Sequence, residues 1–269
     1  MFTVGVYIMT LNERYETLKK HIRDLKKVVV AFSGGVDSSL LLRVSRDVLG
    51  RKNLVAFIGN FPAFPERELD RAKRIVEEMD CIYEIVETGQ LNDPDFLKND
   101  SNRCYYCKRH MMKKAQIIAN AYNLDYVIEG SNTDDLNDYR PGMKACVELG
   151  IISPFIKAGL NKTQIRKLSR MLSIPTYDKP SFSCLATRIP YGTAIKQEIL
   201  KLIDVSEDYI KQLGINDVRV RYHGTIARIE VKEDEMLKIL EQRKQIAEAL
   251  IQYGFSHITL DLKGYQRPF

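Results

Sequence analysis

Short, unbroken apolar runs alternate with helical stretches through the first half of the chain. The first run is VVVAF at 28–32, and such a run is typical of a strand buried on both faces of a parallel sheet. The expected strands are 28–32, 54–58, 81–86 and 126–129, and the expected helices are 11–25, 36–49, 65–79 and 103–122. This alternation predicts an α/β fold with an open parallel sheet and helices on both faces. A ligand should then bind at the carboxyl ends of the strands.

The pattern changes after residue 150. Asn161 predicts the start of a helix that ends near residue 172, and the proline-containing segment 174–193 predicts a long ordered loop. A helix, two strands, a second helix and a last strand are expected at 195–213, 218–222, 226–231, 233–252 and 258–262. We therefore expect a large α/β domain at 1–180, a cysteine-bearing loop at 181–194 and a small α+β domain at 195–269.

The composition is that of an ordinary globular protein, with 45% hydrophobic and 28% charged residues. No apolar run approaches the roughly 18 residues of a membrane span, and the start of the chain lacks the basic region of a secretory signal. Five cysteines are too few for a disulfide scaffold, so we expect a cytoplasmic protein without a membrane partner.

The formal net charge of +6 lies in residues 1–194, because basic and acidic side chains balance over 195–269. This excess is spread along the chain and forms no basic tail. A small phosphorylated ligand fits such a distribution at least as well as RNA does, and we do not expect a nucleic-acid partner.

The segment SGGVDSS lies between the first expected strand and its helix. Its glycines let the backbone approach an anion closely, and the helix N-terminus favours negative charge. Its hydroxyl groups add donors, whereas Asp37 is better suited to cap the helix or to bind a phosphate-bound magnesium ion. The candidate phosphate-binding residues are Ser33, Gly34, Gly35, Val36, Asp37, Ser38 and Ser39. A plain strand-to-helix turn favours the same residue types, and the chain has no Walker sequence.

A second polar segment, GSNTDD at 130–135, follows the fourth expected strand, on the same edge of the sheet. Its acidic side chains could bind magnesium or ribose hydroxyls, and Arg140 could offset phosphate charge. The candidates here are Gly130, Asn132, Asp134, Asp135 and Arg140. A capped turn is the alternative, because Asn, Thr and Asp favour turns.

The segment at 33–39 matches the SGG-x-DS signature of the N-type ATP pyrophosphatases, or PP-loop enzymes. The segments EGSNTDDLNDYRPG (129–142), CYYC (104–107) and PSFSCLATRIPYG (180–192) further resemble the LarE family of ATP-dependent sulfur transferases. That resemblance extends over nearly the whole chain. It implies ATP and Mg²⁺ as cofactors and pyridinium-3,5-biscarboxylic acid mononucleotide as the substrate. Each carboxylate of that substrate would be adenylated and converted to a thiocarboxylate, for a nickel-pincer nucleotide cofactor.

Three cysteines are candidates for the sulfur chemistry. Cys104 and Cys107 form a C-x-x-C pair whose sulfurs share one face of a helix, and Cys184 lies near Arg188, a cation that favours the thiolate. Three thiolates are one short of an all-cysteine zinc site but suit a 4Fe–4S cluster with one open iron. In the resembling enzymes that iron binds sulfide, and in another branch the cysteine at position 184 gives up its own sulfur. A redox dithiol, or inert core thiols, are the other interpretations.

Charged residues of the C-terminal domain supply further candidates. Arg219 and Arg221 alternate along one strand, so with Arg188 they could hold a substrate phosphate. Glu207 and Glu230 are weaker candidates for a divalent ion. The alternative is that Arg219 and Arg221 simply lie on a solvent-exposed strand face and bind no ligand, and the sequence fits this interpretation equally well. Cys81 and Cys146 are expected to be small core residues.

The expected enzyme is therefore a sulfur transferase that uses ATP to activate the substrate, with Cys184, Asp37 and Arg188 in catalysis. Its partners would be a small nucleotide substrate and sulfide or another sulfur donor, and the resemblance also allows a homo-oligomer. A tRNA thiolase would share the adenylation chemistry but would need a broad basic surface. An ammonia-using synthetase would have no use for the three cysteines, and a nucleotide sensor would release no pyrophosphate.

Overall fold

The computed structural model describes residues 9–137, 139–180 and 183–265. These residues form two compact units, and several chain segments contribute to each unit. The first unit contains the residues up to Phe61, Glu66–Gln90 and Cys104 onward to the end of the described part at residue 180. The second unit contains Pro62–Pro65, Leu91–Arg103 and the chain from Ser183.

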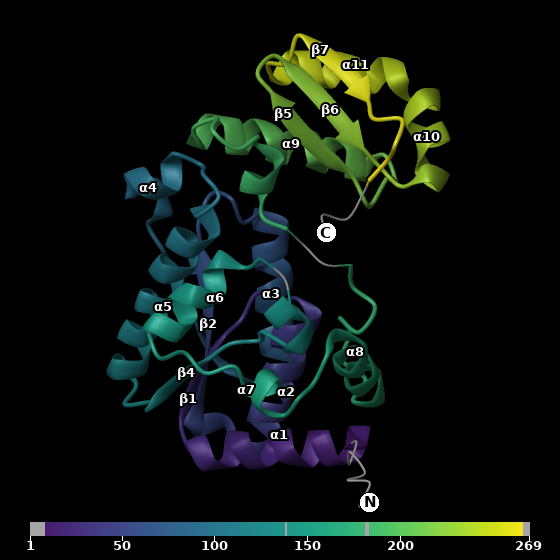
Figure 1. The fold of residues 1–269 in the computed structure, drawn as a ribbon. Coiled ribbons are helices and arrows are strands. Elements are labelled where there is room, and N and C mark those ends of the chain that lie inside the picture. The colour runs from purple at the N-terminus through teal and green to yellow at the C-terminus, as the bar shows by residue number, and fades with distance from the viewer. Residues whose placement is uncertain (1–8, 138, 181–182, 266–269) are drawn as a thin grey trace, which may run out of the picture. The chain divides into compact units, whose positions relative to one another are not determined.

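The first unit is built on a parallel sheet of four strands in the order β3-β2-β1-β4 (Figure 1). The strands are β1 (Val28–Ala31), β2 (Leu54–Asn60), β3 (Ile82–Glu87) and β4 (Tyr126–Ile128). Val29 of β1 pairs with Val55 on one side and with Val127 on the other. These apolar residues are buried because helices cover both faces, which is why the runs do not alternate with polar residues.

Helices pack on both faces of this sheet. The helices of this unit are α1 (Leu11–Leu25), α2 (Val36–Leu49), α3 (Glu66–Glu78), α5 (Arg103–Ala121), α6 (Pro141–Glu148), α7 (Pro154–Lys157) and α8 (Lys162–Met171). Of these, α1 and α8 contact α2, and α7 contacts α1. Val29 and Phe57 pack against Met112 and Ala115 of α5 on one face, while α2 and α3 contact the strands on the other. The expected open parallel α/β fold is therefore confirmed. No helix within 9–137, 139–180 and 183–265 is long and apolar enough to cross a membrane.

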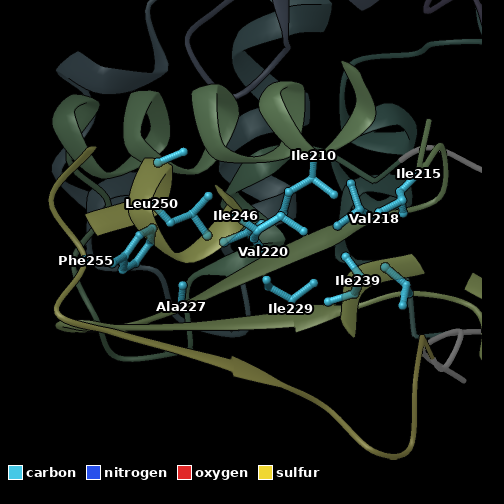
Figure 2. Packing of buried hydrophobic residues seen from close by; sticks show 12 residues of the cluster. Ile210, Ile215, Val218, Val220, Ala227, Ile229, Ile239, Ile246, Leu250 and Phe255 are labelled. Carbon is cyan, nitrogen blue, oxygen red and sulfur yellow. The ribbon is translucent and has the colours of Figure 1, made fainter. Parts of the chain in front are cut away.

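The second unit has a smaller mixed sheet in the order β5-β6-β7. Its elements are α4 (Pro94–Leu97), α9 (Gln197–Gln212), β5 (Arg219–His223), β6 (Ile226–Glu230), α10 (Met236–Glu241), α11 (Arg243–Tyr253) and β7 (His257–Leu260). β5 and β6 are antiparallel, and β7 is parallel to β6. Figure 2 shows one sheet face burying Val220 and Ile229 against Ile210 of α9 and Ile246 of α11. This is the expected small α+β domain.

One local expectation needs correction, and a second gains detail. The helix expected at 233–252 is interrupted at Gln242, which separates α10 from α11, and a 3-10 turn at Glu233–Glu235 precedes it. The sequence has no glycine or proline near Gln242, so no helix-breaking residue marks the break and the apolar residues keep their helical spacing through it. The expected loop at 174–193 contains a 3-10 turn at Leu185–Arg188, and its residues 181 and 182 lie outside the described part.

Candidate active site

The segment Ser33–Ser39 joins β1 to α2 and leaves the start of that helix without a side-chain cap. The residue before the helix is Gly35, which has no side chain to accept the first N–H groups. Ser38 Oγ donates to the Gly35 carbonyl at 3.1 Å and lies 3.2 Å from Ser33 Oγ. Ser39 is buried, and its hydroxyl has no hydrogen-bond partner among the described residues. Unsatisfied N–H groups and the helix dipole make this loop suited to an anion.

The polar segment after β4 lies directly against this loop. A Cβ atom on Gly130 would lie 3.2 Å from both Asp37 Cβ and the Ser38 nitrogen, so a larger residue would push the two segments apart. β1 pairs with β2 on one side and with β4 on the other, so the chain reverses direction across the sheet between β1 and β4. Ligands of open α/β sheets bind at such a point.

Asp37 is held by two residues from distant parts of the sequence. Its carboxylate forms an ion pair with Lys162 Nζ and accepts a hydrogen bond from Asn132 Nδ2 at 3.5 Å. Lys162 is the first residue of α8. Sequence reasoning missed this lysine because its basic neighbourhood is typical of a solvated helix face. The ion pair places a cation beside the phosphate loop.

The other acidic residues of this segment mainly hold the turn. Asn132 Oδ1 accepts from the Asp134 nitrogen at 3.0 Å, and Asp135 Oδ2 accepts from the Asn132 nitrogen at 2.9 Å. Arg140 pairs with Asp135 at 2.9 Å, and the Lys162 nitrogen donates to Asp134 at 3.0 Å. Burial raises the pKa of Asp135. A capped turn by itself therefore explains why asparagine and aspartate occur at these positions. The role of these residues in nucleotide binding stays a prediction.

A half-buried ion pair that the sequence did not reveal lies next to this turn. Glu129 directly follows β4 and pairs with Lys108 of α5 at 3.0 Å. It also accepts from Ser153 Oγ at 2.6 Å and from Ser131 Oγ at 2.9 Å. Burial by itself would raise the pKa of Glu129, but the attraction of Lys108 and the hydroxyl donors lower it. The pair fixes α5, the helix that carries the C-x-x-C cysteines, to the carboxyl end of β4.

The C-x-x-C pair lies in the first turn of α5. Cys104 is exposed and Cys107 is half-buried, with Gln90 Nε2 donating to Cys107 Sγ at 3.6 Å. No group of three or more His, Cys, Asp or Glu residues in the described ranges could hold a metal ion. Cys184 belongs to the second unit, so the structure does not test a site shared by all three cysteines.

Arg188 fixes the turn that follows Cys184. Its Nη1 atom donates to the Ser183 carbonyl at 2.8 Å and to the Cys184 carbonyl at 3.2 Å, so the backbone on both sides of the cysteine is held. The same guanidinium pairs with Glu207 of α9 at 2.8 Å, and both side chains are completely buried. Burial by itself would raise the pKa of Glu207, but the attraction of Arg188 lowers it.

The remaining charged candidates join the same network. Arg221 pairs with Glu230 at 2.8 Å and donates to the Thr187 carbonyl at 2.8 Å. Arg219 is buried with no partner for its Nε atom among the described residues, and burial lowers its pKa. Both glutamates thus have arginine partners. Binding of a substrate phosphate or a divalent ion by this network stays a prediction.

The two cysteines assigned to the core are both buried. Burial raises the pKa of the thiols of Cys81 and Cys146 to about 11. A neutral thiol in an apolar site is a poor nucleophile and a poor metal ligand, so these two cysteines are structural.

The fold and the loop between β1 and α2 define an ATP-using α/β enzyme of the PP-loop class. A family described as NAD synthase matches residues 10–132. An NH(3)-dependent NAD(+) synthetase of Fusobacterium nucleatum is 26% identical over 61% of this chain and 64% of its own length.

Longer matches identify the family within that class. An uncharacterized protein of Synechocystis sp. is 37% identical over 95% of this chain and 96% of its own length. The pyridinium-3,5-bisthiocarboxylic acid mononucleotide synthase of Lactiplantibacillus plantarum is 35% identical over 96% of this chain and 93% of its own length. The chain belongs to the family of this synthase, the LarE family, and the resemblance seen in its motifs is confirmed.

Substitution of Asp37 tests the phosphate loop. Because the carboxylate stands at the start of α2 beside Lys162, we expect Asp37→Ala to lower substrate-dependent pyrophosphate release at least about a hundredfold while the protein stays folded. Asp47→Ala is the matched control, since this exposed residue of α2 pairs with Arg43 on the surface. Unchanged release by Asp37→Ala at saturating magnesium would remove Asp37 from the nucleotide site.

Substitution of Arg188 tests the buried network. Arg188→Met removes the guanidinium from the buried Glu207 carboxylate and leaves it the more distant Lys211 at 3.9 Å, so the free energy of unfolding should fall by about 3–5 kcal/mol at neutral pH. Because the pair lowers the pKa of Glu207, its contribution exists above the ordinary glutamate pKa and is lost as the pH falls through the lowered value. Urea unfolding measured against pH should show the deficit shrinking in acid. Arg43→Met, which breaks an exposed pair, should cost less than about 1 kcal/mol, and equal losses would contradict the assignment.

Proposed function

We propose that this protein is an ATP-dependent sulfur transferase that converts the two carboxylates of pyridinium-3,5-biscarboxylic acid mononucleotide to thiocarboxylates. The observation that carries the proposal is the 35% identity, over nearly the full length of both chains, to a pyridinium-3,5-bisthiocarboxylic acid mononucleotide synthase. The phosphate loop at the switch point of the sheet supports the ATP-dependent step. The product would be a precursor of the nickel-pincer cofactor.

In the first step, a substrate carboxylate oxygen attacks the α phosphorus of ATP. The bond from that phosphorus to the bridging oxygen breaks, and pyrophosphate leaves with the electron pair. The N–H groups at the start of α2 and the serine hydroxyls would stabilise the negative charge of the phosphates. Magnesium, when bound, would neutralise phosphate charge, with Asp37 as a ligand. Lys162 would then be released from Asp37 and could turn to the phosphates.

In the second step, a sulfur nucleophile attacks the carbonyl carbon of the acyl adenylate. The carbon–oxygen bond to AMP breaks, AMP leaves with the electron pair on its phosphate oxygen, and a thiocarboxylate remains. Adenylation is needed because a carboxylate oxygen is a poor leaving group. The same two steps on the second carboxylate complete the product. The monophosphate of the substrate would be held by Arg219 and Arg221, whose strand alternation puts them on one face of the smaller sheet.

For the source of sulfur, we propose a 4Fe–4S cluster held by Cys104, Cys107 and Cys184. The first two cysteines fit as ligands, because they lie one helical turn apart, Cys104 is exposed and Cys107 Sγ accepts an amide hydrogen bond. Such a cluster, when bound, would supply an open iron for external sulfide. Hydrogen bonds from Arg188 would hold the Cys184 turn in one conformation for this role. The alternative, in which Cys184 gives up its own sulfur, requires neither Cys104 nor Cys107.

Substitution of Cys184 should separate the two steps. Adenylation needs no thiol, so Cys184→Ala should still release pyrophosphate from ATP in the presence of the substrate but should yield no thiocarboxylate. Mass spectrometry of the product and a pyrophosphate assay measure the two steps independently. Cys81→Ala, which replaces a buried structural cysteine, is the control and should keep both pyrophosphate release and thiolation. Wild-type thiolation by Cys184→Ala would show that this cysteine is not on the sulfur route, and thiolated RNA as the product would overturn the substrate assignment.

Iron analysis decides between the two sulfur sources. Protein purified without oxygen should carry about four iron atoms per chain, and Cys104→Ser or Cys107→Ser should lose them. With added sulfide the loaded enzyme should turn over many times. An iron-free protein that makes at most one thiolation per chain, with loss of one hydrogen sulfide at Cys184, would establish the sacrificial route instead.

A further inference from the structure

Lys179 is a buried lysine that the proposed reaction does not yet use. Its Nζ atom donates to the Gly34 carbonyl at 3.0 Å and to Glu68 Oε2 at 2.7 Å. The lysine side chain is 6% exposed and the glutamate side chain 15% exposed. Burial lowers the pKa of Lys179, although Glu68 opposes this effect. The charge of the ammonium group is balanced by Glu68, so it is a poor candidate for a direct phosphate ligand.

Three elements of the first unit meet at Gly34. Gly34 has a φ of +67°, which favours glycine, and a Cβ atom there would lie 3.4 Å from Ala72 Cβ of α3. Glu68 lies one turn earlier on the same helix, so α3 presents both residues toward the loop. Arg166 of α8 donates to the Lys179 carbonyl at 2.9 Å and to the Tyr177 carbonyl at 2.7 Å. Lys179 therefore reaches the loop from a fixed backbone.

The peptide between Gly34 and Gly35 is the one that Lys179 holds. In a trans peptide the C=O and N–H groups point in opposite directions, so a carbonyl bound to Lys179 aims the Gly35 N–H away from it. A peptide between two glycines rotates more easily than any other, because neither residue has a Cβ to restrict it. Rotation by half a turn would present a carbonyl oxygen where an anion needs an N–H group.

We propose that Lys179 is a positioning residue for the phosphate loop: it prevents rotation of the Gly34–Gly35 peptide and keeps the Gly35 N–H aimed at the bound phosphates of ATP. Glu68 keeps Lys179 charged and in place. This proposal rests on the proposed ATP-dependent activation of the substrate, and it assigns a function to a lysine outside the SGGVDSS segment.

The experiment compares Lys179→Met with Lys179→Arg. Methionine has a similar length but donates no hydrogen bond, so the KM for ATP in pyrophosphate release should rise about tenfold or more, and arginine should restore much of the loss. The inhibition constant of inorganic pyrophosphate should rise in parallel, whereas that of adenosine, which has no phosphates, should not change. Lys73→Met is the matched control, because Lys73 is an exposed residue of α3 paired with Asp70.

The double variant Lys179→Met/Glu68→Gln covers the case in which Lys179→Met does not fold, since it leaves no uncompensated charge. Wild-type constants for ATP and pyrophosphate in a folded variant lacking the Lys179 ammonium would overturn the proposal, even if its stability were lower. If the wild type released no pyrophosphate at all, the proposed function would fail. Calorimetric binding of inorganic pyrophosphate to the same variants would then still decide the role of Lys179.

Discussion

β1 pairs with β2 on one side and with β4 on the other, and the candidate site depends on this arrangement. The two crossovers leave in opposite directions, so the carboxyl ends of β1 and β4 are free of a covering connection between them. Gly130 allows the segment after β4 to approach within van der Waals distance of Asp37. The start of α2 thereby lies against a second polar segment, and an anion at this point would meet N–H groups, hydroxyls and the neighbouring Lys162.

Three lysines from distant segments pair with acidic residues around this edge. Lys162 pairs with Asp37, Lys179 with Glu68, and Lys108 with Glu129. Both side chains of the Lys162–Asp37 pair are partly exposed, so this pair would be able to rearrange if magnesium and ATP bound. Lys179 and Glu129 are buried, and each holds a backbone group in place. A site for a highly charged ligand benefits from fixed groups such as these, because donors that are already in place reduce the reorganisation that binding would otherwise require.

The second unit is organised by hydrogen bonds between segments far apart in sequence. Arg103 donates to the Ala186 carbonyl at 2.9 Å, Asn99 donates to the Pro190 carbonyl at 2.8 Å, and the Leu185 nitrogen donates to the Ala63 carbonyl at 2.9 Å. With the buried Arg188–Glu207 pair, these bonds hold the segment after Cys184 from several sides. The backbone on both sides of Cys184 is therefore held by partners from several segments of this unit.

The sequence by itself determined the parallel α/β fold and the small mixed sheet with its helices, because each depends on local patterns, and it placed the candidate phosphate loop between the first strand and its helix, where phosphate binding stays a prediction. Apolar runs predicted the strands, and Asn161 predicted a helix start that the structure confirms with a capping box to Gln164. The family, too, was evident from short motifs. The break at Gln242 could not be predicted, since no residue there disfavours a helix and the packing of Ile239 and Ile246 against the smaller sheet decides it. Only the tertiary structure revealed Lys162, Lys179 and the Lys108–Glu129 pair. An ion pair depends on the distance between two side chains in space, and no periodicity along a chain records which lysine a distant carboxylate will meet.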